Sequence, residues 1–288
     1  MKIIYALMLA LFSVAASAQN VDVDKLTLPD GFSVSVYAEI ENPRQLAIGA
    51  NNTVFVGSLR GSVWALINPE EDIRAREAVR VAEGLNTPSG VAYHGGDLFV
   101  GEIDRISTIQ NIDTKLNGVQ STKTVTDDLP NRRHHGFKFL AIGPDDKIYL
   151  PVGAPCNVCE EEEIFGTLLK MNLDGSDLEI IAKGIRNTVG LDFHPSSGEL
   201  WFTDNGRDML GDDLPACEIN RLAAEGQHFG FPYIHQGDLP DPRFGDGHNP
   251  RDYTPPVLKL GAHVAPLGLA FYRGEEFPKR FLNTVFWA

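Results

Sequence analysis

The sequence TPSGVAYHGGDLFVGEIDRISTI, residues 87–109, places two short apolar runs on either side of a Gly-Gly pair. Short alternating runs of this kind are typical of half-buried β-strands, and the Gly95-Gly96 pair is a turn signal between them. The first run has the form Gly-hydrophobic-Ala-hydrophobic and is centred on Ala92. The stretch therefore predicts a pair of strands around a turn, and its pattern recurs along the chain.

The recurring unit occurs five times and sets the predicted architecture. The spacings between successive units are 45, 49, 51 and 78 residues when they are aligned on Ala47, Ala92, Ala141, Asp192 and Ala270. Three of these spacings are close to the length of a four-stranded propeller blade, and the longest one indicates an insertion. No helical periodicity persists over three turns, so we expect few helices. Radial repetition protects sheet edges, which favours a propeller over a sandwich or an open barrel.

We therefore predict an all-β, six-bladed β-propeller of which about five blades are present in this chain. The fifth unit stops inside a hydrophobic run, Val285-Phe286-Trp287. We expect the propeller to be incomplete at its C-terminus, in a whole chain that is roughly a quarter to a third longer at ~40–50 residues per blade.

The N-terminus predicts export. Lys2 is followed by an apolar run over residues 3–14 and then by Ala-Ala-Ser-Ala at 15–18, which is the pattern of a secretory signal peptide. We expect residues 1–18 to be removed and residues 19–288 to form one propeller domain. The predicted location is periplasmic or secreted.

The net charge bears on possible partners. It is −14 for the whole chain, and the sequence pI is about 4.9. Nucleic acid and anionic membrane surfaces attract basic faces, so we expect neither as a partner. A small neutral or cationic ligand stays compatible with this charge.

Three cysteines occur in the chain. Cys156 and Cys159 have C-x-x-C spacing, but the following residue is Glu160 rather than His, which does not support covalent haem attachment. In an oxidising compartment a local disulfide is favoured over a redox or metal site. Cys217 is then the odd thiol, unless it pairs with one of the other two.

A dense polar segment, Asp204-Asn205-Gly206-Arg207-Asp208, follows the predicted strand 199–203. Loops that leave the inner strands of a propeller converge at one end of its channel, so main-chain carbonyls here are placed to bind a hard cation. The spacing does not fit an EF-hand loop. An ordinary Asp-Asn-Gly turn is the alternative interpretation.

Two further polar groups precede the third and fourth units. His134 and His135 come before the third, and Arg186 and Asn187 before the fourth. A neutral His is a natural general base near pH 7, and an Arg can hold an anionic oxygen without losing its proton. Alternatively, His135 is a hydrogen-bonded structural imidazole and Arg186 a partner in a surface ion pair.

Three motifs, in this order, resemble the glucose/sorbosone dehydrogenase family. They are HGFKFLAIGPDDKIYLPVG from His135, IRNTVGLDFHPSSGELWFTDNGRDMLGDDLP from Ile185 and EINRLAAEGQHFGFPY from Glu218. The resemblance runs from about Pro43 to the end of the chain and is densest between His134 and Tyr233. It implies a soluble quinoprotein that uses pyrroloquinoline quinone (PQQ) and calcium to oxidise an aldose or related sugar aldehyde.

By this resemblance, His135 matches the catalytic base, seven residues before Ile142. Arg186 and Asn187 match the pair that contacts the cofactor, with Arg186 stabilising charge on its oxygens during catalysis. Gly206 and Arg207 match the positions whose main-chain carbonyls bind the calcium. The implied partners are a small-molecule sugar and an electron acceptor such as a cytochrome or quinone.

The sequence departs from the family pattern at several positions. The Arg207 side chain is not needed by a main-chain ligand, and we expect a clash or an ion pair with Asp204, Asp208 or Asp212. His134 stands next to the assigned base and is the second candidate for that role. The family's later cofactor-binding basic residues are absent, so we expect these 288 residues to bind quinone weakly or not at all. The alternative functions are a calcium-dependent lactonase-type propeller and a non-catalytic binding propeller.

Overall fold

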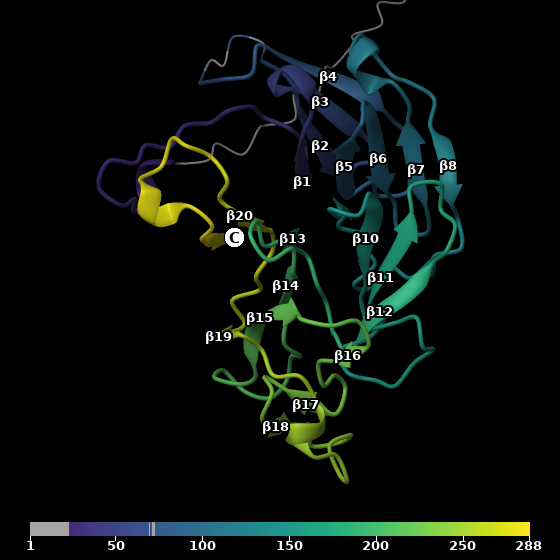
Figure 1. The fold of residues 1–288 in the computed structure, drawn as a ribbon, viewed down its shortest axis with the longest axis vertical. Helices are drawn as coiled ribbons and strands as arrows, with labels where there is room; N and C mark the ends of the chain where they lie inside the picture. Colours follow the sequence, from purple (N-terminus) through teal and green to yellow (C-terminus); the bar gives the residue numbers. More distant parts are fainter. Residues whose placement is uncertain (1–22, 69, 71–72) are drawn as a thin grey trace, which may run out of the picture.

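The computed structural model describes residues 23–68, 70 and 73–288, and the predicted signal peptide lies outside them. Throughout these residues the strands form successive small sheets, and each helix is a short 3-10 turn (Figure 1). None of the described helices is long and apolar enough to span a bilayer. The turns are η1 (Val23–Lys25), η2 (Ala50–Asn52), η3 (Ile112–Thr114), η4 (Pro250–Asp252) and η5 (Lys279–Phe281).

Four sheets form the blades of a propeller, and the four strands of each blade pair antiparallel in chain order. Blade 1 contains β1 (Pro43–Ile48), β2 (Val54–Ser58), β3 (Val63–Ile67) and β4 (Glu77–Ala82). Blade 2 contains β5 (Gly90–His94), β6 (Asp97–Gly101), β7 (Ile106–Ile109) and β8 (Lys123–Thr126). Blade 3 contains β9 (Ala141–Ile142), β10 (Lys147–Val152), β11 (Thr167–Asn172) and β12 (Glu179–Lys183). Blade 4 contains β13 (Leu191–Phe193), β14 (Leu200–Asp204), β15 (Ala216–Leu222) and β19 (Leu258–Ala262).

A two-stranded sheet of β20 (Leu269–Phe271) and β21 (Val285–Trp287) follows blade 4. The five aligned repeat positions lie in β1, β5, β9, β13 and β20. These are the first strands of the four blades and of the β20–β21 sheet. The predictions of an all-β propeller and of its repeat unit are therefore confirmed. Closure with six blades stays a prediction.

The hydrophobic core consists of layers between successive sheets. One buried cluster joins blades 1 and 2 around Phe55 and Leu98, a second joins blades 2 and 3, and a third joins blades 3 and 4 around Phe202. A smaller cluster packs Ile219 of blade 4 against Leu269 and Phe271 of β20. Because each buried cluster joins one sheet to the next along the chain, the order of sequence repeats becomes the order of blades in space.

Gly90 shows how closely neighbouring blades approach each other. It begins β5, and a Cβ at this position would lie 1.9 Å from the carbonyl oxygen of Lys138, in the segment that leads to β9. That distance is far below van der Waals contact, so only glycine fits without a backbone shift. The glycine of the repeat motif is thus explained here by close packing of one unit on the next.

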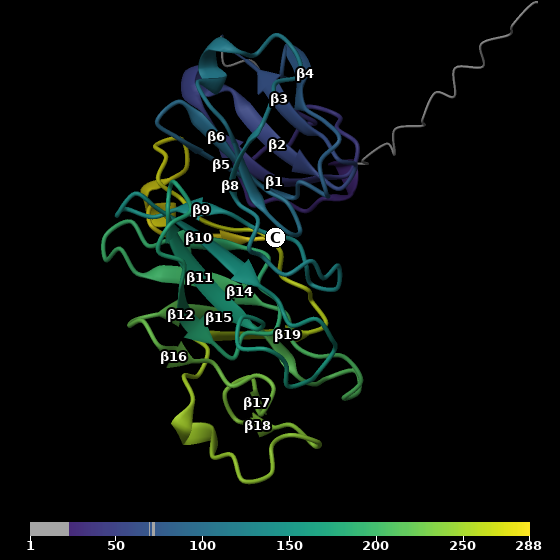
Figure 2. The same ribbon diagram turned by 90° about the vertical axis from the view of Figure 1, so that its right-hand side faces the viewer.

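The predicted insertion lies inside blade 4, between β15 and β19. It contains β16 (Gln227–His228), which pairs in parallel with β12 of blade 3, and a hairpin of β17 (Ile234–His235) and β18 (Leu239–Pro240). Figures 1 and 2 show this hairpin beyond the edge of blades 3 and 4. The insertion therefore joins the outer edge of blade 3 to blade 4.

We expect Gly90→Ala to lower the free energy of unfolding by roughly 1–3 kcal/mol, because the new methyl group must displace the Lys138 carbonyl. Gly268 occupies the corresponding position before β20, and a Cβ there would meet no atom within 4 Å. Gly268→Ala is therefore the matched control, with little expected effect. Urea denaturation measures the stability of both variants. Equal unfolding midpoints for Gly90→Ala and Gly268→Ala would contradict the close-packing explanation.

Candidate functional site

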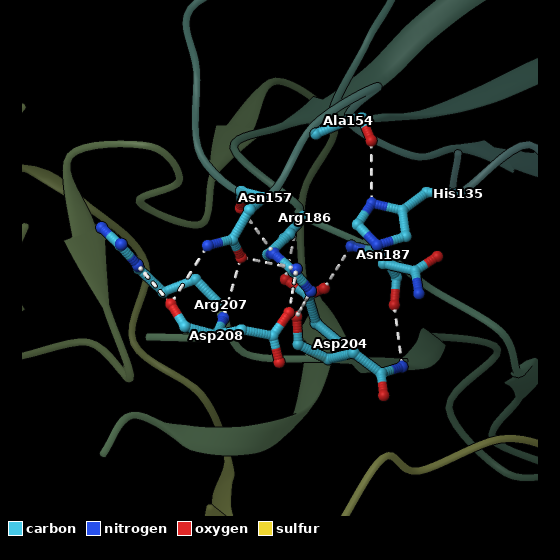
Figure 3. Close-up of polar contacts among 9 residues, drawn as sticks. His135, Ala154, Asn157, Arg186, Asn187, Asp204, Arg207 and Asp208 are labelled. Atoms are coloured by element: carbon cyan, nitrogen blue, oxygen red, sulfur yellow. Dashed lines mark hydrogen bonds and ion pairs between the residues drawn. The ribbon is translucent and has the colours of Figure 1, made fainter. Parts of the chain in front are cut away.

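The polar residues predicted from the sequence meet at the junction of blades 3 and 4 (Figure 3). His135 precedes β9, Arg186 and Asn187 lie between β12 and β13, and Gly206 and Arg207 follow β14. The β14 strand is shifted by one residue from its predicted range of 199–203.

His135 is held in one orientation by the backbone around it. Its Nδ1 atom lies 2.8 Å from the carbonyl oxygen of Ala154, which can only accept a hydrogen bond. Nδ1 therefore carries the proton, and Nε2 is left with the lone pair that a general base needs. Gly153 lets the backbone of His135 approach closely, since a Cβ there would lie 2.6 Å from the His135 Cβ and 2.7 Å from its carbonyl oxygen.

The electrostatic surroundings keep His135 neutral. Burial, followed by the positive charge of Arg186 and then by His134, lowers the pKa of His135 to about 4, although the Ala154 hydrogen bond acts in the opposite direction. The neighbouring His134 is exposed, and its ring centroid lies 4.1 Å from that of His135. At neutral pH the imidazole of His135 is thus ready to accept a proton.

Arg186 is almost completely buried, with 4% of its surface exposed. Its Nε donates to the Asn157 carbonyl at 2.8 Å, and Nη1 donates to the Asn205 carbonyl at 3.1 Å. Its Nη2 donates to Asn157 Oδ1 at 3.0 Å and to Asp208 Oδ2 at 3.2 Å. These contacts rule out the interpretation of Arg186 as a surface ion-pair partner, because the guanidinium is fixed inside the protein.

A buried carboxylate, Asp204, fixes the main chain at Arg186 and Asn187. The N–H of Arg186 donates to Asp204 Oδ2 at 3.0 Å, and the N–H of Asn187 donates to Oδ1 at 2.6 Å. Asn205 continues this link, since its N–H and its Nδ2 both donate to the Asn187 carbonyl at 3.1 Å. The polar end of β14 thus holds the segment that enters blade 4 and is more than a surface turn.

Asp204 faces a second buried acid, Glu218, directly across the β14–β15 pair. Burial, together with the charge of Asp204, raises the pKa of Glu218 to about 8. Burial also raises the pKa of Asp204, to about 6, against the hydrogen bonds from the Asn187 and Arg186 N–H groups. The positive charge of Arg186 favours the charged form of Asp204, although the ion pair of the guanidinium is with Asp208.

The structure corrects the expected partner of Arg207. Its guanidinium forms no ion pair with the side chains of Asp204, Asp208 or Asp212, although Nε donates to the main-chain carbonyl of Asp208 at 3.1 Å. The ion pair is with Asp241, which follows the β17–β18 hairpin and whose Oδ2 accepts from Nη1. His235 Nε2 lies 2.8 Å from the same oxygen. The expectation was wrong because the insertion, far along the chain, brings its own carboxylate to this position. Sequence spacing gave no signal for this contact.

The backbone of Gly206 and Arg207 offers oxygen donors for a cation. In the described parts of the chain, neither carbonyl accepts a hydrogen bond from the protein. Carbonyl oxygens are among the ligands that calcium prefers. Over the same described residues, no group of three or more His, Cys, Asp or Glu side chains is arranged to hold a metal ion.

The cysteine prediction is confirmed and leads to a residue that sequence reasoning missed. Cys156 and Cys159 form a disulfide, and Cys217 is a buried free thiol. Asn157, inside the disulfide loop, contacts both Arg186 and Asp208. The C-x-x-C spacing predicted a constrained loop, but it did not indicate that the loop reaches the site.

A hollow of about 200 Å³ lies beside the site. Ala154, whose carbonyl orients His135, and Gly184 are part of its lining. Its wall includes Phe231, Tyr233 and the four consecutive glutamates 160–163. Tyr233 donates its hydroxyl proton to Glu160 at 2.8 Å. The hollow therefore presents aromatic faces together with carboxylate acceptors.

Comparison with known proteins gives consistent results. The family model described as glucose/sorbosone dehydrogenase matches residues 100–288. An uncharacterised protein of Borreliella burgdorferi is 32% identical over 289 residues, which cover 96% of this chain and 74% of that protein.

Solved structures share the fold at low sequence identity. The calcium structure of a Trichoderma reesei carbohydrate-active enzyme of family AA12 is 18% identical with a TM-score of 0.70, over 80% of this chain and 70% of that one. The PQQ-bound aldose sugar dehydrogenase of Streptomyces coelicolor is 18% identical with a TM-score of 0.65, over 84% and 75%. The apo form of the soluble aldose sugar dehydrogenase of Escherichia coli is 17% identical with a TM-score of 0.61, over 86% and 80%.

We expect Asp241→Asn to destabilise the protein by about 3–5 kcal/mol, because it leaves the buried Arg207 guanidinium without its charged partner. Asp238→Asn is the control in the same insertion, since the Asp238–Lys259 pair is exposed and worth no more than about 1 kcal/mol. Denaturation in guanidinium chloride measures the free energy of unfolding of both variants. Similar losses in the two would show that the buried pair has no special role.

The same pair has a defined pH dependence. Burial acts to raise the pKa of Asp241, but hydrogen bonds from His235, the Arg243 N–H and Arg207 outweigh it and lower that pKa to about 2. A carboxyl group with a depressed pKa stabilises the fold above its unfolded pKa of about 3.9. The stabilisation that Asp241 provides is therefore lost as the pH falls from about 3.9 through about 2.

Proposed function

This chain belongs to the glucose/sorbosone dehydrogenase family, and on that premise we propose that it oxidises an aldose or related sugar aldehyde with PQQ and calcium as cofactors. The observation that carries the proposal is the pairing of an oriented neutral imidazole, His135, with the buried guanidinium of Arg186. The proposed product is the lactone or acid. The proposed site of action is the periplasm or the exterior of the cell.

The residues at the site suit these two groups chemically. The uncommitted carbonyl oxygens of Gly206 and Arg207 are hard donors suited to calcium. A guanidinium carries five N–H groups, and the protein contacts of Arg186 use four of them. The remaining Nη1 proton, with the side chain of Asn187, is the group that would contact an oxygen of the quinone.

The protein's own part in the reaction is proton transfer and charge stabilisation. When bound, PQQ would supply the acceptor for the hydride that leaves C1 of the sugar. Nε2 of His135 takes the proton of the anomeric hydroxyl, so the C–O bond becomes the carbonyl of the lactone as both hydrogens leave. The fixed positive charge of Arg186 is suited to stabilise the negative charge that would develop on the oxygens of the quinone.

The hollow beside Ala154 supports the proposed substrate class. Aromatic faces and carboxylate oxygens are the usual partners of sugar C–H surfaces and hydroxyl groups, and Phe231, Tyr233 and Glu160 offer both. An electron acceptor such as a cytochrome or a quinone would complete the cycle. The acidic net charge gives no support to nucleic acid or an anionic membrane as a partner.

Reconstitution tests the proposed activity. We expect protein mixed with PQQ and Ca²⁺ to reduce an electron-accepting dye when an aldose is added, and to lose this activity with a calcium chelator. Protein with calcium but without PQQ is the control. Hydrolysis of a sugar lactone that needs calcium and no PQQ would instead establish the lactonase-type alternative.

His135→Ala should lower turnover by roughly 10²–10⁴-fold while PQQ binding is largely kept, because the variant removes only the base. His134→Ala is the matched control and should be close to the parent, since its ring is exposed. The parent should keep kcat/KM constant as the pH falls toward about 4 and lose it below, where His135 gains a proton. A fully active His135→Ala variant would transfer the role to His134.

A further inference from the structure

Asn157 makes four hydrogen bonds that connect three segments of the site (Figure 3). Its carbonyl accepts from Arg186 Nε at 2.8 Å, and its Oδ1 accepts from Arg186 Nη2 at 3.0 Å. The same Oδ1 accepts from the N–H of Asp208 at 2.8 Å, and Nδ2 donates to the Asp208 carbonyl at 3.1 Å. Both the main chain and the side chain of Asn157 are thus committed to the site.

The other partners of Arg186 hold it less firmly. Asn205 supplies one carbonyl. The Asp208 carboxylate is 64% exposed, so solvent screens its attraction for the guanidinium. Of the four hydrogen bonds that the Arg186 guanidinium donates, two are accepted by Asn157. The direction of the buried guanidinium therefore depends mainly on this residue.

The disulfide fixes Asn157 in turn. Cys156 and Cys159 close a loop with only Asn157 and Val158 between them. A loop of this size has few backbone conformations, so the asparagine carbonyl and amide are presented together with little loss of entropy on docking. Asn157 lies 29 residues before Arg186 and 51 before Asp208, and the loop brings it to both.

We propose that Asn157 is a positioning residue, which the Cys156–Cys159 disulfide holds in place and which directs the Arg186 guanidinium toward the reaction centre. This inference deepens the proposed function and rests on it for its catalytic consequence. Asn157 acts through Arg186, and the placement of Arg186 is a property of the apo protein that is measurable without PQQ.

The first experiment measures that placement in the apo protein. The charged or titratable groups that act on His135 are Arg186, His134 and Asp208. In Asn157→Ala the guanidinium loses its hydrogen bond to Oδ1. The loop also loses both side-chain contacts with Asp208, which help to hold the main-chain carbonyl that accepts from Nε. The guanidinium therefore spends less time near the imidazole. We expect the His135 pKa, followed by NMR of the ring protons and assigned with His135→Gln, to rise by about one unit from its value near 4.

Two further variants make this result specific. Val158→Ala changes the other residue inside the same disulfide loop and should leave the His135 titration unchanged. Cys156→Ser/Cys159→Ser keeps Asn157 but frees the loop, and we expect a smaller rise of the His135 pKa than in Asn157→Ala. This double variant also keeps the proposal testable if Asn157→Ala folds poorly.

The second experiment uses protein with PQQ, Ca²⁺ and an aldose. We expect Asn157→Ala to lower kcat roughly 10–100-fold with a smaller change in KM, because a misdirected Arg186 fails mainly in the transition state. An unchanged His135 titration in Asn157→Ala would overturn the proposal, and so would a kcat within twofold of the parent. A raised His135 pKa in a protein that never oxidises sugars would support the positioning role and contradict the proposed function alone.

Discussion

The site depends on one buried carboxylate, Asp204, at the end of β14. It accepts the main-chain N–H groups of Arg186 and Asn187, so it fixes the backbone from which both side chains extend. A carboxylate that accepts N–H groups in a buried position makes strong, directional hydrogen bonds. The positive charge of the nearby Arg186 also favours the charged form of Asp204. The last residue of one inner strand thereby positions the loop that leads into the first strand of the same blade.

Support for this arrangement comes from both sides of the junction between blades 3 and 4. On the blade 3 side, the disulfide loop delivers Asn157 to the guanidinium of Arg186. On the blade 4 side, the insertion delivers Asp241 to Arg207, whose own backbone carbonyl is one of the proposed calcium ligands. A cofactor enzyme needs its protein groups held rigidly, since the protein contributes orientation and electrostatics while the cofactor carries the redox chemistry. Both supports are irregular segments attached to regular blades.

The charge states of the site follow from burial and from neighbouring charges. The positive charge of Arg186 helps to hold His135 neutral, and burial together with the charge of Asp204 raises the pKa of Glu218. A neutral base beside a fixed cation is suited to removing a proton from a sugar hydroxyl, because the base is already unprotonated at neutral pH. The low pKa of His135 also makes it a weak base, so the proposed reaction relies on the acceptor and on Arg186 for much of its driving force.

The sequence by itself determined the repeat and therefore the fold. The five aligned positions fall in the first strands of the four blades and of the β20–β21 sheet because a short hydrophobic run followed by a turn signal is a local property, and it recurs in each of the five units. It also indicated His135, Arg186 and Asn187, which the fold brings together, and the local disulfide. Only the tertiary structure decided that Asn157 holds Arg186 and that Arg207 pairs with Asp241 rather than with a neighbouring aspartate. Those contacts join loops 29 and 34 residues apart, and no periodic pattern specifies which irregular loops meet, because their course is set by the packing of whole blades.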